Sequence, residues 1–107
     1  MAAAKLTVIY TVPKDIDAFE KQYNEVHVPM AVDKLSGKTK IVVTKVSKCL
    51  QSPVPYHRIA EIHFPSLAAL EACLASPGGQ ETAAHAVSIS TGGTPIFLIG
   101  EEETFTF

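Results

Sequence analysis

The sequence lacks several features that would assign it to a common class of protein. Lysine and arginine number 9 against 11 aspartate and glutamate residues, so the chain lacks the basic excess that nucleic-acid binding usually needs. No uninterrupted apolar run approaches the roughly 20 residues that span a bilayer, so we expect no membrane partner. The first residues do not combine a basic segment with a long apolar stretch, and we therefore expect a cytoplasmic protein.

Cysteine and the usual patterns of metal ligands are also scarce. The two cysteines are Cys49 and Cys73, and without export we expect reduced thiols rather than a disulfide. His57 and His63 are separated along an expected strand by about 20 Å, at roughly 3.3 Å per residue. They cannot ligate one metal ion, whose bonds to histidine nitrogen are about 2 Å. The sequence therefore predicts no metal site, and its glycine pairs lack the spacing of a phosphate-binding loop.

Length and apolar content, by contrast, favour one folded domain. The chain has 107 residues, of which 47% are hydrophobic and 19% are charged. Domains usually run to about 100–150 residues, and a composition of this kind can bury a real core. We therefore expect a single domain that spans residues 1–107.

Strand and helix signals alternate along the chain. Runs rich in β-branched and aromatic residues predict strands over 5–12, 39–48, 56–64 and 94–103. Asp15 and Asp17 can cap a first helix. Its apolar face follows three- and four-residue steps through Ile16, Phe19, Tyr23, Val26 and Met30. Pro29 predicts a kink or an end of that helix close to Val28.

A second helical region lies between the third and fourth expected strands. Ser66 can cap its first helix. Ser76-Pro77 predicts that the helix restarts there as a separate piece, with serine at the cap and proline at the first position.

The order strand, helix, strand, strand, helix, strand is the ferredoxin-like βαββαβ pattern. This is an α+β fold with an antiparallel sheet and helices on one face. Alternation along the third strand places His57, Ile59, Glu61 and His63 on one side and Tyr56, Arg58, Ala60, Ile62 and Phe64 on the other. Both sides include apolar residues, whereas the chain's own helices can cover only one. We therefore expect a homodimer in which a second copy packs sheet to sheet.

His27 is the most informative candidate for chemistry. It lies near the end of the first expected helix, beside Pro29, which can aim the imidazole ring at the sheet. A neutral imidazole in a partly apolar cleft is a suitable general acid or base near pH 7. The alternative is a structural histidine that caps the last carbonyls of the helix.

Further residues are candidate contacts for a small substrate. The phenols of Tyr10 and Tyr23 can orient a carbonyl or hydroxyl of a ligand, although both residues also suit a core. Met30 and Phe64 would supply apolar wall. His85 lies in an alanine-rich helix, where a ring that points to solvent is the alternative to a binding role.

Motifs spread over nearly the whole chain resemble the EthD-domain family. The first strand, followed by Phe19-x-x-x-Tyr23-x-x-x-His27-Val28-Pro29, is similar to the opening of these proteins. Residues 55–64 resemble their third strand, and 70–80, with the break Ser76-Pro77-Gly78-Gly79-Gln80, resembles their second helix. The similarity continues from Gly92-Gly93 to residues 98–101.

The resemblance implies a ferredoxin-like monomer that dimerises into an α+β barrel, with a cofactor-free pocket between the helices and the sheet. The family takes its name from bacterial ethyl tert-butyl ether degradation, where this component accompanies a cytochrome P450 system. Related proteins include fungal dehydratases or decarboxylases of aromatic polyketides and lactone isomerases. In those relatives the histidine that matches His27 is the natural candidate for proton transfer. His85 departs from the family, which often has an acid in this helix.

These features predict a cofactor-independent enzyme that moves protons on a small, apolar, oxygen-bearing substrate. It would act as an isomerase, lyase or dehydratase, with His27 as the general base or acid, because proton transfer needs neither metal nor organic cofactor. The alternative is a non-catalytic small-molecule-binding accessory protein of an oxidative, ether-degrading, cytochrome P450-linked pathway. A third possibility is a dimerisation module without ligand.

Overall fold

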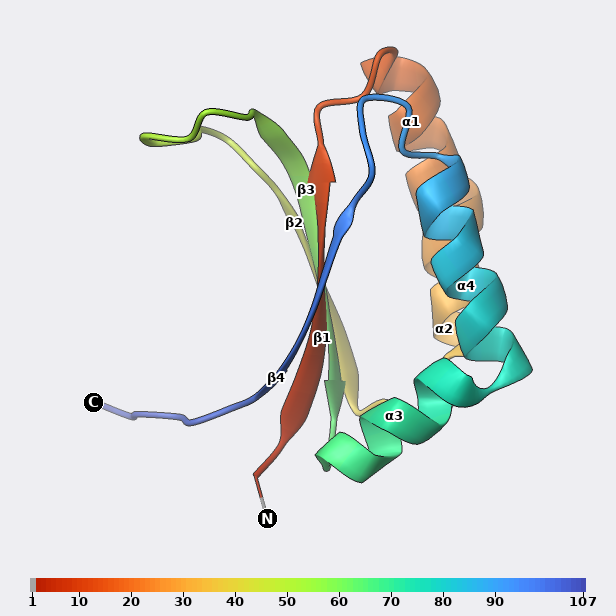
Figure 1. The fold of residues 1–107 in the computed structure, drawn as a ribbon, viewed down its shortest axis with the longest axis vertical. Coiled ribbons are helices and arrows are strands. Elements are labelled where there is room, and N and C mark those ends of the chain that lie inside the picture. The colour runs from red at the N-terminus through yellow and green to blue at the C-terminus, as the bar shows by residue number, and fades with distance from the viewer. Residues whose placement is uncertain (1) are drawn as a thin grey trace.

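Four strands form one antiparallel sheet in the computed structural model, which describes residues 2–107 (Figure 1). The elements are β1 (Ala4–Thr11), α1 (Ile16–Gln22), the π-helical turn η1 (Tyr23–His27), α2 (Val28–Lys34), β2 (Lys40–Lys45), β3 (Tyr56–Phe64), α3 (Leu67–Ala75), α4 (Pro77–Ser88) and β4 (Ile96–Glu101). The strands lie in the order β2-β3-β1-β4, each antiparallel to its neighbours. This confirms the ferredoxin-like α+β fold that the order of elements predicts.

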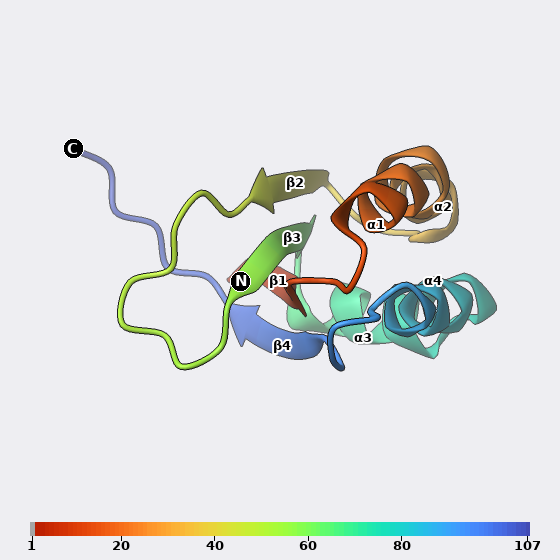
Figure 2. The ribbon, with the colours of Figure 1, turned by 90° about the horizontal axis from the view of Figure 1, so that it is seen from above.

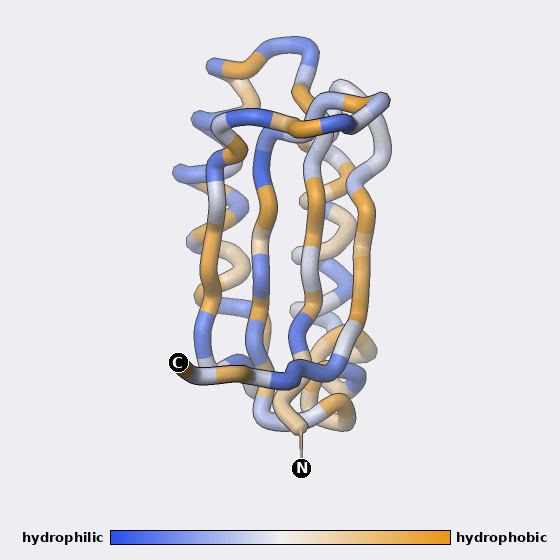
Figure 3. Tube along the Cα trace, turned by 90° about the vertical axis from the view of Figure 1, so that its left-hand side faces the viewer, coloured by the Kyte–Doolittle hydropathy of each residue, from blue (hydrophilic) through white to orange (hydrophobic). Residues whose placement is uncertain are grey.

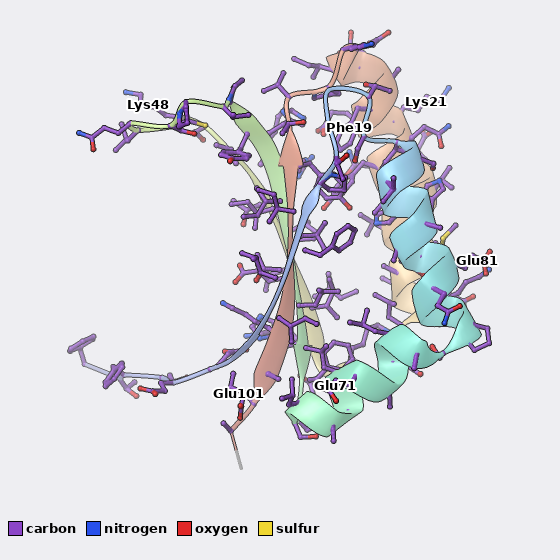
Figure 4. All side chains as sticks on the ribbon, in the orientation of Figure 1. Phe19, Lys21, Lys48, Glu71, Glu81 and Glu101 are labelled. Carbon is purple, nitrogen blue, oxygen red and sulfur yellow. The ribbon has the colours of Figure 1, made fainter. Side chains whose placement is uncertain are left out.

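The helices cover one face of the sheet and leave the other face open (Figures 1 and 2). Seen from above, α1 with α2 and α3 with α4 form two groups of helices that lie side by side in one layer on that face (Figure 2). The hydrophobic core fills the space between the helices and the sheet. Phe19, which is labelled in Figure 4, belongs to this core. The largest fully buried side chains of the core are Tyr10, Tyr23, Phe64, Leu70 and Cys73.

The first helix begins where the sequence predicts and then widens instead of ending. Asp15 is its N-cap, and the Asp15 carboxylate accepts a hydrogen bond from the Ala18 N–H. In η1 the hydrogen bonding becomes π-helical, and the Val28 N–H donates to the Tyr23 carbonyl. Pro29 accounts for the wide turn, because proline has no N–H to donate and its ring crowds the preceding turn. The break predicted near Val28 is therefore a change of helical pitch, at which α2 begins.

Serine side chains start both helices of the second helical region. The Ser66 hydroxyl caps α3, and the Ser76 hydroxyl accepts the Gly79 N–H at the start of α4, which has Pro77 in its first turn. The predicted restart at Ser76-Pro77 is confirmed. Gly79 lies so close to the end of α3 that an added Cβ would be 1.9 Å from the Cys73 carbonyl oxygen. Glycine is therefore required at position 79, where the first turn of α4 packs against the end of α3.

A bulge in β3 changes which residues face the helices. The pairing of β1 with β3 shifts at the end of β1, and this leaves His57 as the extra residue of β3. Both His57 and the next residue, Arg58, reach Glu20 of α1 on the helix side. The expectation that His57 shares the opposite face with His63 is therefore wrong, because the bulge interrupts the alternation on which it was based.

The open face of the sheet, which is turned towards the viewer in Figure 3, carries apolar residues together with ion pairs. The strand register places Val42, Ile96 and Leu98 on this face, with 37%, 38% and 51% of their surface exposed. Between them, Lys5 pairs with Glu61 at 2.6 Å, and His63 Nδ1 lies 2.6 Å from a Glu102 carboxylate oxygen. Apolar residues thus occur on both faces of the sheet, as the sequence predicts.

The outer strands are shorter than their hydrophobic patterns. β2 covers Lys40–Lys45 instead of 39–48, because its ladder with β3 ends opposite Arg58. β4 covers Ile96–Glu101 instead of 94–103, because only these residues pair with β1. Among residues 2–107, no helix is both long enough and apolar enough to cross a membrane.

Candidate functional site

Phe19, Tyr23 and His27 stack in a row between the helices and the sheet. Their ring centroids are 5.4 Å apart from Phe19 to Tyr23 and 5.8 Å apart from Tyr23 to His27, with interplanar angles of 17° and 26°. Four-residue steps drift around an α-helix, which has about 3.6 residues per turn. The wider π turn reduces this drift and keeps the row aligned. Pro29 therefore contributes to the site by imposing the turn that places His27.

Tyr10 of β1 joins this row to the sheet. Its ring meets Phe19 and Tyr23 edge to face, with centroids 5.5 Å and 5.4 Å apart. Its hydroxyl lies 3.2 Å from His27 Nε2, and both side chains are buried. The structure therefore brings together Tyr10, Tyr23 and His27, the candidates that the sequence places on a strand and a facing helix.

The other ring nitrogen of His27 faces a second histidine. His27 Nδ1 is 2.9 Å from His85 Nδ1, and the two ring planes are 14° from parallel. The ring centroids are 5.1 Å apart, much farther than the nitrogens, so the rings meet edge to edge rather than face to face. His85 thus belongs to the same cluster. The alternative of a ring that points freely to solvent does not apply.

Burial keeps the His27 imidazole neutral at pH 7. Loss of solvation, and then the nearby His85 ring, lower the pKa of His27 from 6.5 to about 4. Burial raises the pKa of Tyr10 well above its usual range, so its phenol stays protonated. At pH 7 the neutral His27 imidazole therefore has one unprotonated ring nitrogen, which can accept a proton.

A small apolar cavity of about 40 Å³ lies beside the row of rings. Tyr23 and His27 line one side of it, and small or aliphatic side chains such as Val8, Ala31 and Ala60 line the others. The Tyr23 hydroxyl is buried and has no hydrogen-bond partner among residues 2–107. Burial also raises the pKa of Tyr23 to about 12. Because buried hydroxyls nearly always have a partner, the Tyr23 hydroxyl is a candidate contact for a polar group of a ligand.

Glu20, His57 and Arg58 form a charged network behind Tyr23. One Glu20 carboxylate oxygen accepts hydrogen bonds from His57 Nε2 and Arg58 Nε at 3.0 Å each, and the other accepts from Arg58 Nη2 at 2.6 Å. Hydrogen bonds from Arg58 lower the pKa of Glu20 to about 2, opposed by burial and helped by His57. The Arg58 guanidinium carbon lies 5.1 Å from the Tyr23 ring centroid, a cation–π contact that holds the ring in place.

Sequence reasoning missed this network. The sequence pattern places Glu20 on the polar face of a helix. In a regular strand, the neighbouring residues His57 and Arg58 would point to opposite faces of the sheet. Only the bulge turns both residues towards Glu20. No local pattern in the sequence signals it.

Of the five predicted substrate contacts, only Tyr23 lines the cavity. Tyr10 contacts His27 without lining it, and His85 lines a separate surface cleft. Met30 is half-buried on α2 and does not line the cavity. Phe64 is fully buried at the end of β3, opposite Ala4, and belongs to the core. Within residues 2–107, no group of three or more histidine, cysteine and acidic side chains is placed to hold a metal ion.

The sequence model of one protein family matches most of the chain. The EthD family, described as the EthD domain, matches residues 13–88. A Rhodococcus erythropolis protein, described as an uncharacterized 11.0 kDa protein in the thcB-thcC intergenic region, is 29% identical over 98 residues. That similarity covers 92% of this chain and 94% of the relative.

Several solved structures share the fold. An EthD family protein of Bacillus halodurans is 22% identical with a TM-score of 0.85, covering 94% of this chain and 99% of the other. A dimeric ferredoxin-like protein of unknown function from Jannaschia is 17% identical with a TM-score of 0.63, covering 94% and 99%. Hydroxynitrile lyase from Passiflora edulis is 13% identical with a TM-score of 0.75, covering 98% of each chain. At these identities the similarity shows the fold alone.

Proposed function

The chain belongs to the EthD domain family, and on that premise we propose that it is a cofactor-independent enzyme that transfers protons on a small, apolar, oxygen-bearing substrate. It acts as an isomerase, lyase or dehydratase. The observation that carries the proposal is that a neutral His27 and Tyr23, whose buried hydroxyl has no hydrogen-bond partner among residues 2–107, line the same apolar cavity. The hydroxynitrile lyase of the same fold is a precedent for lyase chemistry on this scaffold.

Each polar group at the cavity has a distinct role. The Tyr23 hydroxyl donates a hydrogen bond to the substrate oxygen, and Arg58 holds the Tyr23 ring in position. The Tyr10 hydroxyl, which does not line the cavity, holds the His27 ring at Nε2 and releases that nitrogen when substrate enters. His27 Nε2 is then free to take a proton from the substrate and to return it. The apolar walls exclude water, and the small volume favours a substrate of few heavy atoms.

Proton transfer can be tested before the natural substrate is known. The protein is incubated in D₂O with a panel of small ketones, lactones and β-hydroxy ketones, and exchange of carbon-bound hydrogen for deuterium is followed by NMR. We expect exchange that His27→Gln lowers by about two to four orders of magnitude, because glutamine can hydrogen-bond but cannot exchange a proton near pH 7.

His63→Gln is the matched control, because His63 pairs with Glu102 on the open face of the sheet. This variant should exchange as fast as the unaltered protein. Equal rates for His27→Gln and His63→Gln would exclude His27 as the proton-transfer group.

The low pKa of His27 favours a second candidate function. A group with a pKa of about 4 is a weak base at pH 7, whereas the most effective general bases have a pKa near the working pH. The protein would then bind a small molecule without turnover, as an accessory of an oxidative, ether-degrading pathway linked to a cytochrome P450. A co-purified small molecule in native mass spectra, without exchange on any compound of the panel, would favour this function over catalysis.

The protein also works as a homodimer in this proposal. The open sheet face exposes apolar residues that a second copy can cover, and a solved neighbour is described as dimeric. Light scattering at micromolar concentration should give twice the mass of one chain. Leu98→Asp, which places a charge on the open face, should give the mass of one chain. A single-chain mass for the unaltered protein would contradict the dimer.

A further inference from the structure

Two histidines from different helices form a hydrogen bond to each other. His27 closes η1, His85 lies within α4, and their Nδ1 atoms are 2.9 Å apart. Two unprotonated nitrogens at this distance would direct their lone pairs at one another. One Nδ1 atom therefore carries a hydrogen and donates it to the other, which makes the contact an N–H···N hydrogen bond.

This contact extends a line that begins at Tyr10. If His27 Nδ1–H donates to His85, then His27 Nε2 accepts the Tyr10 hydroxyl hydrogen at 3.2 Å. If His85 Nδ1–H donates to His27, then His27 Nε2–H donates to the Tyr10 oxygen. The two arrangements contain the two neutral tautomers of His27, and in the second the Tyr10 hydroxyl hydrogen points away from the ring. The contact between the two imidazoles can therefore carry a proton in either direction without movement of the backbone.

The line leads from the inside of the molecule to its surface. Tyr10 and His27 are 1% and 7% exposed, whereas His85 is half-buried. His27 lines the apolar cavity, and His85 lines a separate surface cleft of about 340 Å³ next to Asp15 and Ser88. Of the described residues, none lines both. The two imidazoles therefore connect them.

We propose that His27 and His85 form a proton relay that exchanges protons between the buried cavity and water in the surface cleft. This proposal rests on the proposed function, because the relay gives the buried base His27 a path by which a proton reaches solvent. When His27 Nε2 takes a proton from substrate, its Nδ1 proton passes to His85 Nδ1, and His85 Nε2 releases a proton to water. One proton leaves the substrate and one enters the water, so neither ring keeps a charge.

An imidazole suits both positions of this relay. It accepts a proton at one nitrogen while it releases another from the second, which an amide or a phenylalanine ring cannot do near pH 7. Tyr10 from β1, Tyr23 from η1 and His85 from α4 are titratable groups that contact His27, and Asp15 borders the cleft beside His85. His85 is thus a positioning and relay residue that acts through His27.

The relay can be measured without any substrate. In protein labelled with ¹⁵N-histidine, NMR gives the rate at which the ring N–H hydrogen of His27 exchanges with water. His85→Phe keeps a flat ring beside His27 but removes both nitrogens, and His85→Gln keeps a hydrogen-bonding group. We expect both variants to slow this exchange by about tenfold or more, because His27 is buried and loses its route outwards.

A control and a second readout keep the result unambiguous. His63→Phe, on the open face, should leave the exchange rate of His27 unchanged, and the unaltered protein should show a ¹⁵N–¹⁵N scalar coupling between the two Nδ1 atoms. If His85→Phe does not fold, His85→Gln carries the test. Unchanged exchange in the folded variants, or no coupling in the unaltered protein, would overturn the relay.

The relay and the proposed function can fail separately. Fast His27 exchange that depends on His85, without deuterium exchange on any compound of the panel, supports the relay and argues against catalysis. Deuterium exchange that needs His27 but is unaffected by His85→Gln supports catalysis and overturns the relay.

Discussion

His63 and His27, which lie on opposite faces of the sheet, have different electrostatic surroundings. On the open face, His63 lies 2.6 Å from the Glu102 carboxylate. On the helix face, His27 contacts the uncharged Tyr10 hydroxyl and a second imidazole, and it is buried. A carboxylate favours the charged form of a histidine, whereas burial among neutral groups favours the uncharged form. His27, the group proposed to transfer protons, contacts a phenol and an imidazole, whereas His63 on the open face and His57 on the helix face each contact a carboxylate.

The largest expected effect concerns the ion-pair network of the helix face. Glu20→Ala removes the carboxylate that binds Arg58 and His57, and these two side chains are only 11% and 8% exposed. We expect the free energy of unfolding to fall by about 3 kcal/mol, because breaking a largely buried ion pair leaves charge and hydrogen-bond donors uncompensated. Urea unfolding at fixed protein concentration measures the change.

Glu25→Ala is the matched control for Glu20. Glu25 is an exposed acidic residue in the adjoining turn, and its loss should change the free energy of unfolding by less than about 0.5 kcal/mol. Equal losses for the two variants would show that the network does not stabilise the fold.

The stability of the protein should depend on pH, because His27 is harder to protonate in the folded protein than in the unfolded chain. The pKa of His27 is about 4 in the folded protein and 6.5 when exposed, so the unfolded chain binds more protons between these values. The free energy of unfolding should therefore fall as the pH drops below 6.5, by about 2 kcal/mol between pH 7 and pH 5 from His27 alone. Glu20 does not contribute there, since its stabilisation is lost only below its ordinary pKa of 4.5 and towards about 2.

His27→Phe isolates this contribution. Urea unfolding at pH 7 and pH 5 should show a smaller pH-dependent loss in the variant than in the unaltered protein, by about 2 kcal/mol. An unchanged slope would mean that His27 is protonated as easily in the folded state as in the unfolded chain.

The two tyrosines should respond in opposite directions. Tyr23→Phe removes a buried hydroxyl that has no partner within residues 2–107, so the free energy of unfolding should rise by about 1 kcal/mol while deuterium exchange on a substrate falls. Tyr10→Phe removes the partner of His27 Nε2 and should lower the free energy of unfolding by a similar amount. Thermal unfolding of both variants checks the signs. A destabilised Tyr23→Phe would show that its hydroxyl is satisfied within the fold.

The smallest effect is expected on the open face. Lys5 and Glu61 are partly exposed and form a surface ion pair at 2.6 Å. At a protein concentration low enough to keep the chain monomeric, Lys5→Ala should lower the free energy of unfolding by less than about 1 kcal/mol, because solvent then screens this pair. Urea unfolding of Lys5→Ala and Glu20→Ala in parallel measures the two losses in free energy of unfolding. Equal losses would show that ion pairs stabilise the two faces of the sheet to the same extent.

Local signals account for most of what the sequence predicts correctly. Asp15, Ser66 and Ser76 start helices because their side-chain oxygens accept backbone N–H groups within three residues along the chain. The third strand has the predicted limits, 56–64, because Pro65 follows it directly. The outer strands were predicted too long, because their ends depend on where a neighbouring strand stops pairing.

The candidate site was predictable only in part. The four-residue spacing of Tyr23 and His27 placed them on one helix face, and Tyr10 followed from its place on the facing strand. Met30 shares the helical pattern but lies outside the cavity, because the π turn rotates α2 relative to α1. Nothing in an alanine-rich helix indicates that His85 meets His27.

The sequence by itself determined the order of elements, the helix caps, the break at Ser76-Pro77 and the pairing of Tyr23 with His27. Each of these depends on residues a few positions apart, where backbone geometry alone sets the distance. The tertiary structure decided the contact between His27 and His85, which are 58 residues apart, and the turn of His57 and Arg58 towards Glu20. These depend on how the two groups of helices and the bulged strand β3 pack together. That packing is a property of the whole chain, because each contact needs the others to hold it in place.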